Sequence, residues 1–323
     1  TEVEANPVPV IEVEITRREP YAGGRQFGDS GPYERIDGIL MFAVDPANRA
    51  NRSIVDLDLA SRDAAGRVRF QSDFRLLVPQ DPADGNRRLI VDVVNRGRGV
   101  AVSSFNRTSR SVQGSSEVPI GDEFLFRHGY SIVSIGWQWD VYRSAALMGL
   151  EAPKAHQRGA AVRGQTVVEI RPNAVESTRL LADRVHRPYP ALDVNDPEAV
   201  LLIRDWEDGP DSTVSREQWR FARETEHGVV PSDEHVYLEA GFQPGKIYHV
   251  VYTTQGAPVV GTGLLAVRDV ASWLRKPSPL NLVKGGFEHV YGFGVSQTGR
   301  MLRHFLYLGL NLDEQGEAAF DGL

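Results

Sequence analysis

The chain has 323 residues, of which 41% are hydrophobic and 24% charged, a composition typical of a well-cored globular protein of roughly two domains. The formal net charge of −7, with no Lys/Arg run, argues against nucleic acid or an anionic membrane as a partner, so we expect a small-molecule substrate. The sequence contains no cysteine, which excludes disulfides, thiolate metal sites and a cysteine nucleophile.

The first ten residues, TEVEANPVPV, are neither a signal peptide nor a methionine start. We therefore expect that an upstream segment has been removed, a step that is compatible with export of a soluble protein. The sequence does not determine the compartment. No stretch of the chain approaches the roughly 18 apolar residues that a membrane span needs.

Residues 1–86 are predicted to form an N-terminal β-rich region. Residues 11–15 alternate strictly between apolar and polar side chains, residues 38–44 form an apolar run, and residues 54–59 alternate again. Turn signals such as Ala22-Gly23-Gly24 separate these segments.

Residues 87–323 are predicted to form an α/β core. Its first strands, at 89–94 and 130–135, are rich in branched apolar residues, as buried parallel strands are, and a short helix is predicted at 122–127. We therefore expect an α/β sheet to begin at residue 87.

A large insertion is predicted at about 141–240, where mixed polar sequence interrupts the core over one end of the sheet. It contains predicted strands at 166–170 and 199–203. The α/β order is predicted to resume with a strand at 247–253 and a helix at 262–275, whose apolar residues form one stripe.

The most informative segment lies at 287–310. A β-favouring run at 289–293 leads into GVSQTG at 294–299, and apolar residues then recur at helical spacing. This order is typical of a nucleophile elbow, which holds its serine, here Ser296, in a strained turn with Oγ projecting above the sheet. Thr298 stands where the elbow usually has glycine, so the motif is G-x-S-x-T-G.

Other interpretations of this segment are weaker. Ser296 could simply cap the N-terminus of a helix that follows a buried strand. A phosphate-binding loop would need Lys-Ser or Lys-Thr where the chain has Gly299-Arg300. A dinucleotide fingerprint that begins at Gly292 would need glycine at Gln297.

A second glycine motif opens the helix at 262–275. Residues 261–266 read GTGLLA and match G-x-G-x-x-A, which raises the alternative of a nicotinamide-dependent enzyme. Six residues, 255–260, separate these glycines from the preceding strand, whereas the fingerprint places them in the tight turn itself.

The chain resembles a bacterial family of alpha/beta hydrolase domain-containing proteins over nearly its whole length. The resemblance implies an α/β-hydrolase fold with Ser296 as nucleophile, and it says little about the substrate. The similar stretches are residues 91–106, 124–140, 236–269 and 292–323, and the hallmark motifs are GWQ at 136–138, GFQPG at 241–245, GFGVSQTGR at 292–300 and FDG at 320–322.

The same resemblance implies where the oxyanion hole lies. In this fold one donor is the backbone N–H of the residue after the nucleophile, here Gln297, and the other comes from the loop after the third strand. We interpret that loop as Gly136-Trp137-Gln138, with the Trp137 N–H as second donor. In the alternative interpretation, Trp137 and Trp139 form only a hydrophobic rim.

The general base is not evident. The fold orders its triad Ser, Asp or Glu, His, and only His304 follows Ser296. His304 lies about 12 Å further along the same helix, too far for a base. We therefore expect the sheet to be truncated at the C-terminus, with the triad acid and histidine outside this chain. Seven histidines precede the serine, none of them in a recognisable motif: His128, His156, His186, His227, His235, His249 and His289.

The sequence thus predicts a serine hydrolase, most specifically a carboxylesterase that cleaves a small-molecule ester through an acyl-enzyme on Ser296 and requires no cofactor. The main alternative is a catalytically idle, hydrolase-like protein that binds a ligand. The nicotinamide-dependent enzyme is the third.

Overall fold

A computed structural model describes residues 9–108, 115–184 and 186–323 of the chain. The chain divides into two compact units. We call Thr1–Lys154 with Pro258–Leu323 the sheet unit, and Ala155–Ala257 the inserted unit.

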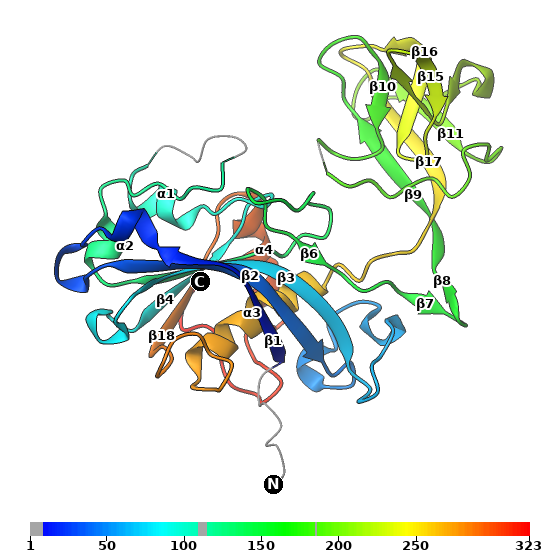
Figure 1. Cartoon of the computed structure of the whole chain (residues 1–323). Helices are drawn as coiled ribbons and strands as arrows, with labels where there is room; N and C mark the ends of the chain where they lie inside the picture. The colour runs from blue at the N-terminus through cyan, green and yellow to red at the C-terminus, as the bar shows by residue number, and fades with distance from the viewer. Residues whose placement is uncertain (1–8, 109–114, 185) are drawn as a thin grey trace. The chain divides into compact units, whose positions relative to one another are not determined.

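A seven-stranded mixed sheet forms the centre of the sheet unit, in the order β1-β2-β3-β5-β4-β18, with β6 paired to β3 (Figure 1). β2 is antiparallel to both of its neighbours, β1 and β3. β3 is antiparallel to β5, and β5, β4 and β18 are parallel. The strands are β1 (Val10–Pro20), β2 (Tyr33–Val44), β3 (Val68–Pro79), β4 (Arg88–Val93), β5 (Ser131–Ile135), β6 (Leu150–Glu151) and β18 (His289–Phe293).

The predicted N-terminal β-rich region supplies β1, β2 and β3 to this sheet. Because β3 pairs directly with β5, the region and the α/β strands share one set of hydrogen bonds. The strand predicted at 54–59 is wrong. Asp56 has a left-handed backbone (φ 60°), and Leu57–Leu59 is a 3-10 turn. The apolar alternation there reflects burial of Ile54 and Leu57, three residues apart, while Val55 is exposed.

Among the described residues, four α-helices accompany the sheet: α1 (Ala101–Phe105), α2 (Phe124–Arg127), α3 (Thr262–Arg275) and α4 (Gln297–Tyr307). In Figure 1, α1 and α2 lie on one side of the sheet and α3 on the other. α3 contacts β1, β4, β5 and β18, and its predicted bounds are confirmed. Short 3-10 turns lie at Tyr21–Gly24, Gly28–Ser30, Arg49–Asn51, Leu57–Leu59, Pro82–Asp84 and Arg216–Gln218.

The central strands are apolar because helices cover both faces of the sheet. Every residue of β5 is buried, as are the last five of β4, as expected for parallel strands between helices. On the face of α1 and α2, one core cluster joins both helices to β2, β3, β4 and β5. Its buried members are Tyr21, Phe27, Tyr33, Leu77, Ile90, Ala101, Val102, Leu125, Phe126 and Ile132.

The inserted unit is built from short antiparallel strands around a core of its own. One sheet has the order β12-β11-β17-β9 and another β10-β16-β13, and β14 pairs with β15 and β7 with β8. The strands are β7 (His156–Gln157), β8 (Ala160–Ala161), β9 (Arg163–Ile170), β10 (Glu176–Leu180), β11 (Val200–Arg204), β12 (Ser212–Val214), β13 (Trp219–Arg220), β14 (Ala222–Thr225), β15 (Gly228–Pro231), β16 (His235–Phe242) and β17 (Ile247–Gln255).

The strand predicted at 247–253 belongs to a different sheet from the one expected. The segment at 247–253 is indeed a strand, β17, but it does not resume the α/β sheet. It pairs antiparallel with β9 and β11 within the inserted unit. Tyr248, Val250 and Tyr252 are buried in the core of that unit, and this burial accounts for their apolar pattern.

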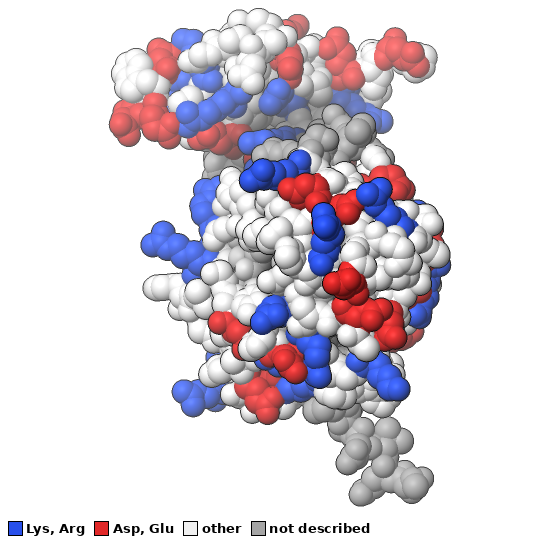
Figure 2. Space-filling model, turned by 90° about the vertical axis from the view of Figure 1, so that its left-hand side faces the viewer, with Lys and Arg blue, Asp and Glu red and all other residues white. Residues whose placement is uncertain are grey.

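Figure 2 shows basic and acidic side chains interspersed over the described residues of the face in view. Within the described part of the chain, no helix combines the length and the apolar character needed to cross a bilayer.

Candidate active site

Ser296 occupies a sharp turn between a strand and a helix. β18 ends at Phe293 and α4 begins at Gln297, so the turn, residues 294–296, is very short. Ser296 is exposed and has φ 58° and ψ −109°, a backbone conformation that non-glycine residues rarely adopt. The strained backbone predicted for this serine is therefore present.

Ser296 does not act as a conventional helix cap. It stands at the N-cap position of α4, but its side chain accepts no capping hydrogen bond, and its φ is positive rather than extended. Within the described residues its hydroxyl has no hydrogen-bond partner. The Gln297 N–H, the first amide of α4, is similarly unused there, as helix N-terminal amides are unless a cap or ligand accepts from them.

Thr298 fills the point where strand and helix come closest. A Cβ on Gly294 would lie 2.7 Å from the Thr298 carbonyl carbon, so only glycine fits at 294. Thr298 is fully buried, and its Oγ1 accepts a hydrogen bond from the Val295 N–H at 2.8 Å. The departure from glycine at 298 thus supplies a buried acceptor that fixes the residue before Ser296.

Replacing Thr298 tests this role. Thr298→Val keeps the volume but leaves the Val295 N–H without its acceptor, so we expect the free energy of unfolding to fall by roughly 1 to 3 kcal/mol in urea titrations. Thr298→Ser keeps the hydroxyl, so its free energy of unfolding should fall by less than that of Thr298→Val. Equal losses in the two variants would show that the hydroxyl contributes nothing.

A loop at residues 94–100, which we call the β4 loop, lies beside this turn. Asn95 Nδ2 donates to the Val295 carbonyl at 2.9 Å. Asn95 and Arg98 exchange two backbone hydrogen bonds around Arg96 (φ 48°) and Gly97 (φ 83°), which makes the tip a tight turn. The Arg96 N–H donates to Gln138 Oε1 at 3.1 Å.

Trp137, predicted as an oxyanion donor, follows β5 rather than β4. Its indole N–H donates to the Val94 carbonyl at 2.8 Å, and its own carbonyl packs against Gly263 of α3. β4 lies between β5 and β18, and the β4 loop runs into α1, the first α-helix. The sheet order therefore favours the β4 loop over Trp137 as the loop next to Ser296.

The β4 loop was not predicted as part of the site, although the sequence contains a signal for it. NRGRG at 95–99 is a glycine-rich turn that comes directly after a predicted strand. The order of strands in the sheet, which decides whether the loop lies near Ser296, is not visible in the sequence.

Asp92 is a buried carboxylate at the end of β4. In register it lies between Ser134 of β5 and Phe293 of β18. It is 1% exposed and accepts hydrogen bonds from the Val100 and Ala101 amides and from Ser134 Oγ. Burial raises the pKa of the Asp92 carboxyl to about 6, although these donors oppose the shift.

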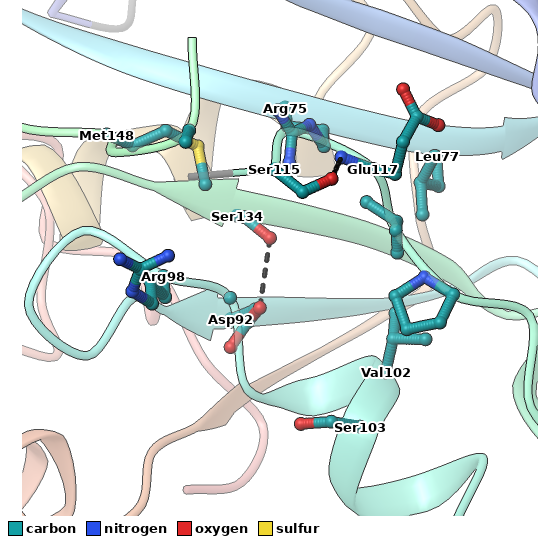
Figure 3. A pocket seen from close by; sticks show the side chains of 14 residues that line it. Arg75, Leu77, Asp92, Arg98, Val102, Ser103, Ser115, Glu117, Ser134 and Met148 are labelled. Carbon is teal, nitrogen blue, oxygen red and sulfur yellow. Dashed lines mark hydrogen bonds between the residues drawn. The ribbon is translucent and has the colours of Figure 1, made fainter. Parts of the chain in front are cut away.

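A small cavity lies next to Asp92. Figure 3 shows the Asp92 and Ser134 side chains pointing toward each other, with Arg98 and Ser103 also on the cavity wall. Its volume of about 40 Å³ holds roughly three water molecules, so it suits solvent or one small polar group but not a whole substrate.

The raised pKa predicts how stability depends on pH. The folded-state pKa of Asp92 lies above 3.8, the ordinary value of an aspartate carboxyl in the unfolded chain. Protonation of Asp92 therefore stabilises the fold fully below about pH 4, and this stabilisation is lost as the pH rises through 6. In Asp92→Asn this loss should disappear. From pH 4 to 7 the unfolding free energy of Asp92→Asn relative to wild type should therefore rise by roughly 2 kcal/mol.

Urea titrations across this pH range measure the difference. Ser103→Ala changes the same cavity wall without removing a titrating group, and it should keep the wild-type pH dependence. A constant difference between Asp92→Asn and wild type would contradict the shift.

No described histidine is hydrogen-bonded to Ser296, so the structure does not identify a general base. In the sheet unit, the ring of His304 stacks on Tyr307, and that of His289 on Tyr291. Within residues 9–108, 115–184 and 186–323, no three metal-ligand side chains are grouped.

The glycine motif at 261–266 has a packing explanation. A Cβ on Gly263 would lie 2.0 Å from the Trp137 carbonyl oxygen, and one on Gly261 would lie 2.8 Å from Ile54. Both glycines therefore permit close contact between α3 and neighbouring chain segments. This contact leaves the dinucleotide alternative without support from the geometry.

Comparison with known proteins gives one match. Residues 208–323, which include α3, β18 and α4, match a family model described as alpha/beta hydrolase domain. No curated protein and no solved structure matches the chain. The match supports the expected family and hydrolase activity in general.

Proposed function

We propose that the protein is a serine hydrolase of the α/β-hydrolase fold that cleaves a small-molecule carboxylic ester. The observation that carries the proposal is the backbone of Ser296, φ 58° and ψ −109°, at an exposed turn between a parallel strand and a helix. A fold retains such strain where it serves a function. The family match over residues 208–323 supports the same class of activity.

In this mechanism Ser296 Oγ attacks the ester carbonyl carbon, and its proton passes to a general base. The carbonyl oxygen becomes an oxyanion that accepts from the Gln297 N–H and from an amide of the β4 loop. The alcohol then leaves with a proton, and water hydrolyses the acyl-enzyme on Ser296. We assign the second donor to the β4 loop in place of Trp137, because Asn95 ties that loop to Val295.

A fluorophosphonate probe tests the proposal on the full-length protein. Labelling should appear as one mass increment on the peptide that contains Ser296 and should be absent from Ser296→Ala. Ser103→Ala, which keeps the turn intact, should label like wild type. Folded protein that shows no labelling at Ser296 would overturn the proposal.

One observation favours the idle ligand-binding alternative. Ser296 Oγ has no histidine partner among the described residues, and a serine without a base is a weak nucleophile. The probe separates the two functions, because an idle serine would stay unlabelled even in folded protein.

A further inference from the structure

We propose that Asp92 is a positioning residue that holds the β4 loop against the turn of Ser296. This inference rests on the proposed function, because the loop is assigned there as part of the oxyanion hole. Asp92 does not reach the reacting atoms, since it is 1% exposed and its hydrogen-bond partners are two backbone amides and one hydroxyl.

The C-terminal end of the β4 loop is hydrogen-bonded to Asp92. Both Asp92 oxygens accept from the Val100 N–H, at 3.1 and 3.0 Å, and one also accepts from the Ala101 N–H at 3.1 Å. Val100 is the N-cap residue of α1 and has no side-chain cap. Asp92 therefore supplies, from the neighbouring strand, the acceptor that the short helix lacks.

Gly99 makes this contact possible. A Cβ at 99 would lie 2.8 Å from Asp92 Oδ2 and 3.2 Å from Ser134 Oγ, so a larger residue would push the loop off the carboxylate. Ser134 Oγ donates to the same oxygen at 2.9 Å and fixes the orientation of the carboxylate (Figure 3).

The N-terminal half of the β4 loop is hydrogen-bonded to the turn of Ser296 and to Gln138. Asn95 donates to the Val295 carbonyl, and the Arg96 N–H donates to Gln138. The loop is thus held at both ends over only seven residues, 94–100. Only Gly99 separates Val100 from the turn closed by Asn95 and Arg98, so we expect a shift at Val100 to move the tip beside Ser296.

Among the described residues, no charged side chain forms an ion pair with Asp92, so an ion-pair role does not explain its burial. Arg75 of β3, Arg98 of the loop and Glu117 line the same cavity. Arg75 is bound to Asp37 at 2.9 Å, and no described residue forms an ion pair with Asp92. The carboxylate therefore acts as a hydrogen-bond acceptor for the loop.

The test uses Asp92→Ala and Asp92→Asn with two readouts. Asp92→Ala removes the acceptor, so the Val100 and Ala101 amides should exchange hydrogen at least about tenfold faster, and fluorophosphonate labelling of Ser296 should slow at least about tenfold. Asp92→Asn keeps one acceptor oxygen. Its amide exchange rates and its Ser296 labelling rate should therefore lie close to those of wild type. Circular dichroism confirms that each variant is folded.

Asn281→Ala is the matched control, because Asn281 also anchors a loop through several backbone hydrogen bonds, at the C-terminus of α3. It should lower stability but leave the labelling rate of Ser296 unchanged. Wild-type labelling in Asp92→Ala, or unchanged exchange at Val100, would overturn the proposal. If wild type does not label, the proposed function fails. The amide chemical shifts of Val295 and Gln297 in Asp92→Ala then decide the positioning role, and unchanged shifts reject it.

Discussion

Ser296→Ala in the full-length protein is expected to lower hydrolysis of an activated ester, such as nitrophenyl acetate, by a factor of about 10³ or more. Removing Oγ deletes the nucleophile but leaves the turn, because the Val295–Thr298 hydrogen bonds do not involve it. Initial rates measure the loss. The unfolding midpoint in urea should remain that of wild type.

Ser296→Gly separates strain from chemistry. Glycine adopts φ 58° at little cost, so this variant should be as inactive as Ser296→Ala but more stable than wild type by about 1 kcal/mol. Turnover in Ser296→Ala within tenfold of wild type would reject the nucleophile. A loss of stability in Ser296→Gly would instead show that the turn is not strained.

The local elements of the site were predictable because their signals are local. The bounds of β18 and α3 agree with the prediction, since a run of β-favouring residues and a single apolar stripe each specify an element without reference to the rest of the chain. The strained backbone of Ser296 was predicted from the elbow motif, and its φ of 58° agrees with that prediction.

Strand pairing was not predictable in the same way. The apolar run at 247–253 specifies a strand, but it does not say that β17 pairs with β9 and β11 rather than with the α/β sheet. Register and partner depend on contacts between residues far apart in sequence. The assignment of Gly136-Trp137-Gln138 as the oxyanion loop stays a prediction. Weighing it against the β4 loop needs the strand order β5-β4-β18, which the sequence does not show.

Asp92 shows a second limit of sequence analysis. In the run LIVDVV it looked like one polar residue on an apolar strand, and nothing nearby in sequence suggested a partner. Its donors come from residues 8, 9 and 42 positions away. A buried acid whose partners are backbone amides leaves no complementary charge for a pattern search to find.

Gly263→Ala is expected to destabilise the fold by about 3 kcal/mol or more, at the upper end of the usual cost of overpacking. Gly263 is the second residue of α3. Alanine is ordinarily favoured over glycine in a helix, by up to about 1 kcal/mol in the interior, so the expected loss must come from a steric clash. That clash is present, because the added Cβ would lie 2.0 Å from the Trp137 carbonyl oxygen, a backbone atom with little freedom to move.

Gly164→Ala is the control, since a Cβ there meets nothing within 4 Å, and its unfolding free energy should change by no more than about 0.5 kcal/mol. Urea titration measures both variants, and calorimetry with NAD tests the competing explanation. If Gly263 instead lets a pyrophosphate approach the helix, wild type should bind NAD, and Gly263→Ala should fold normally but lose that binding. A Gly263→Ala variant as stable as wild type would therefore contradict the packing explanation for the motif at 261–266. Loss of NAD binding in that variant would support the dinucleotide site.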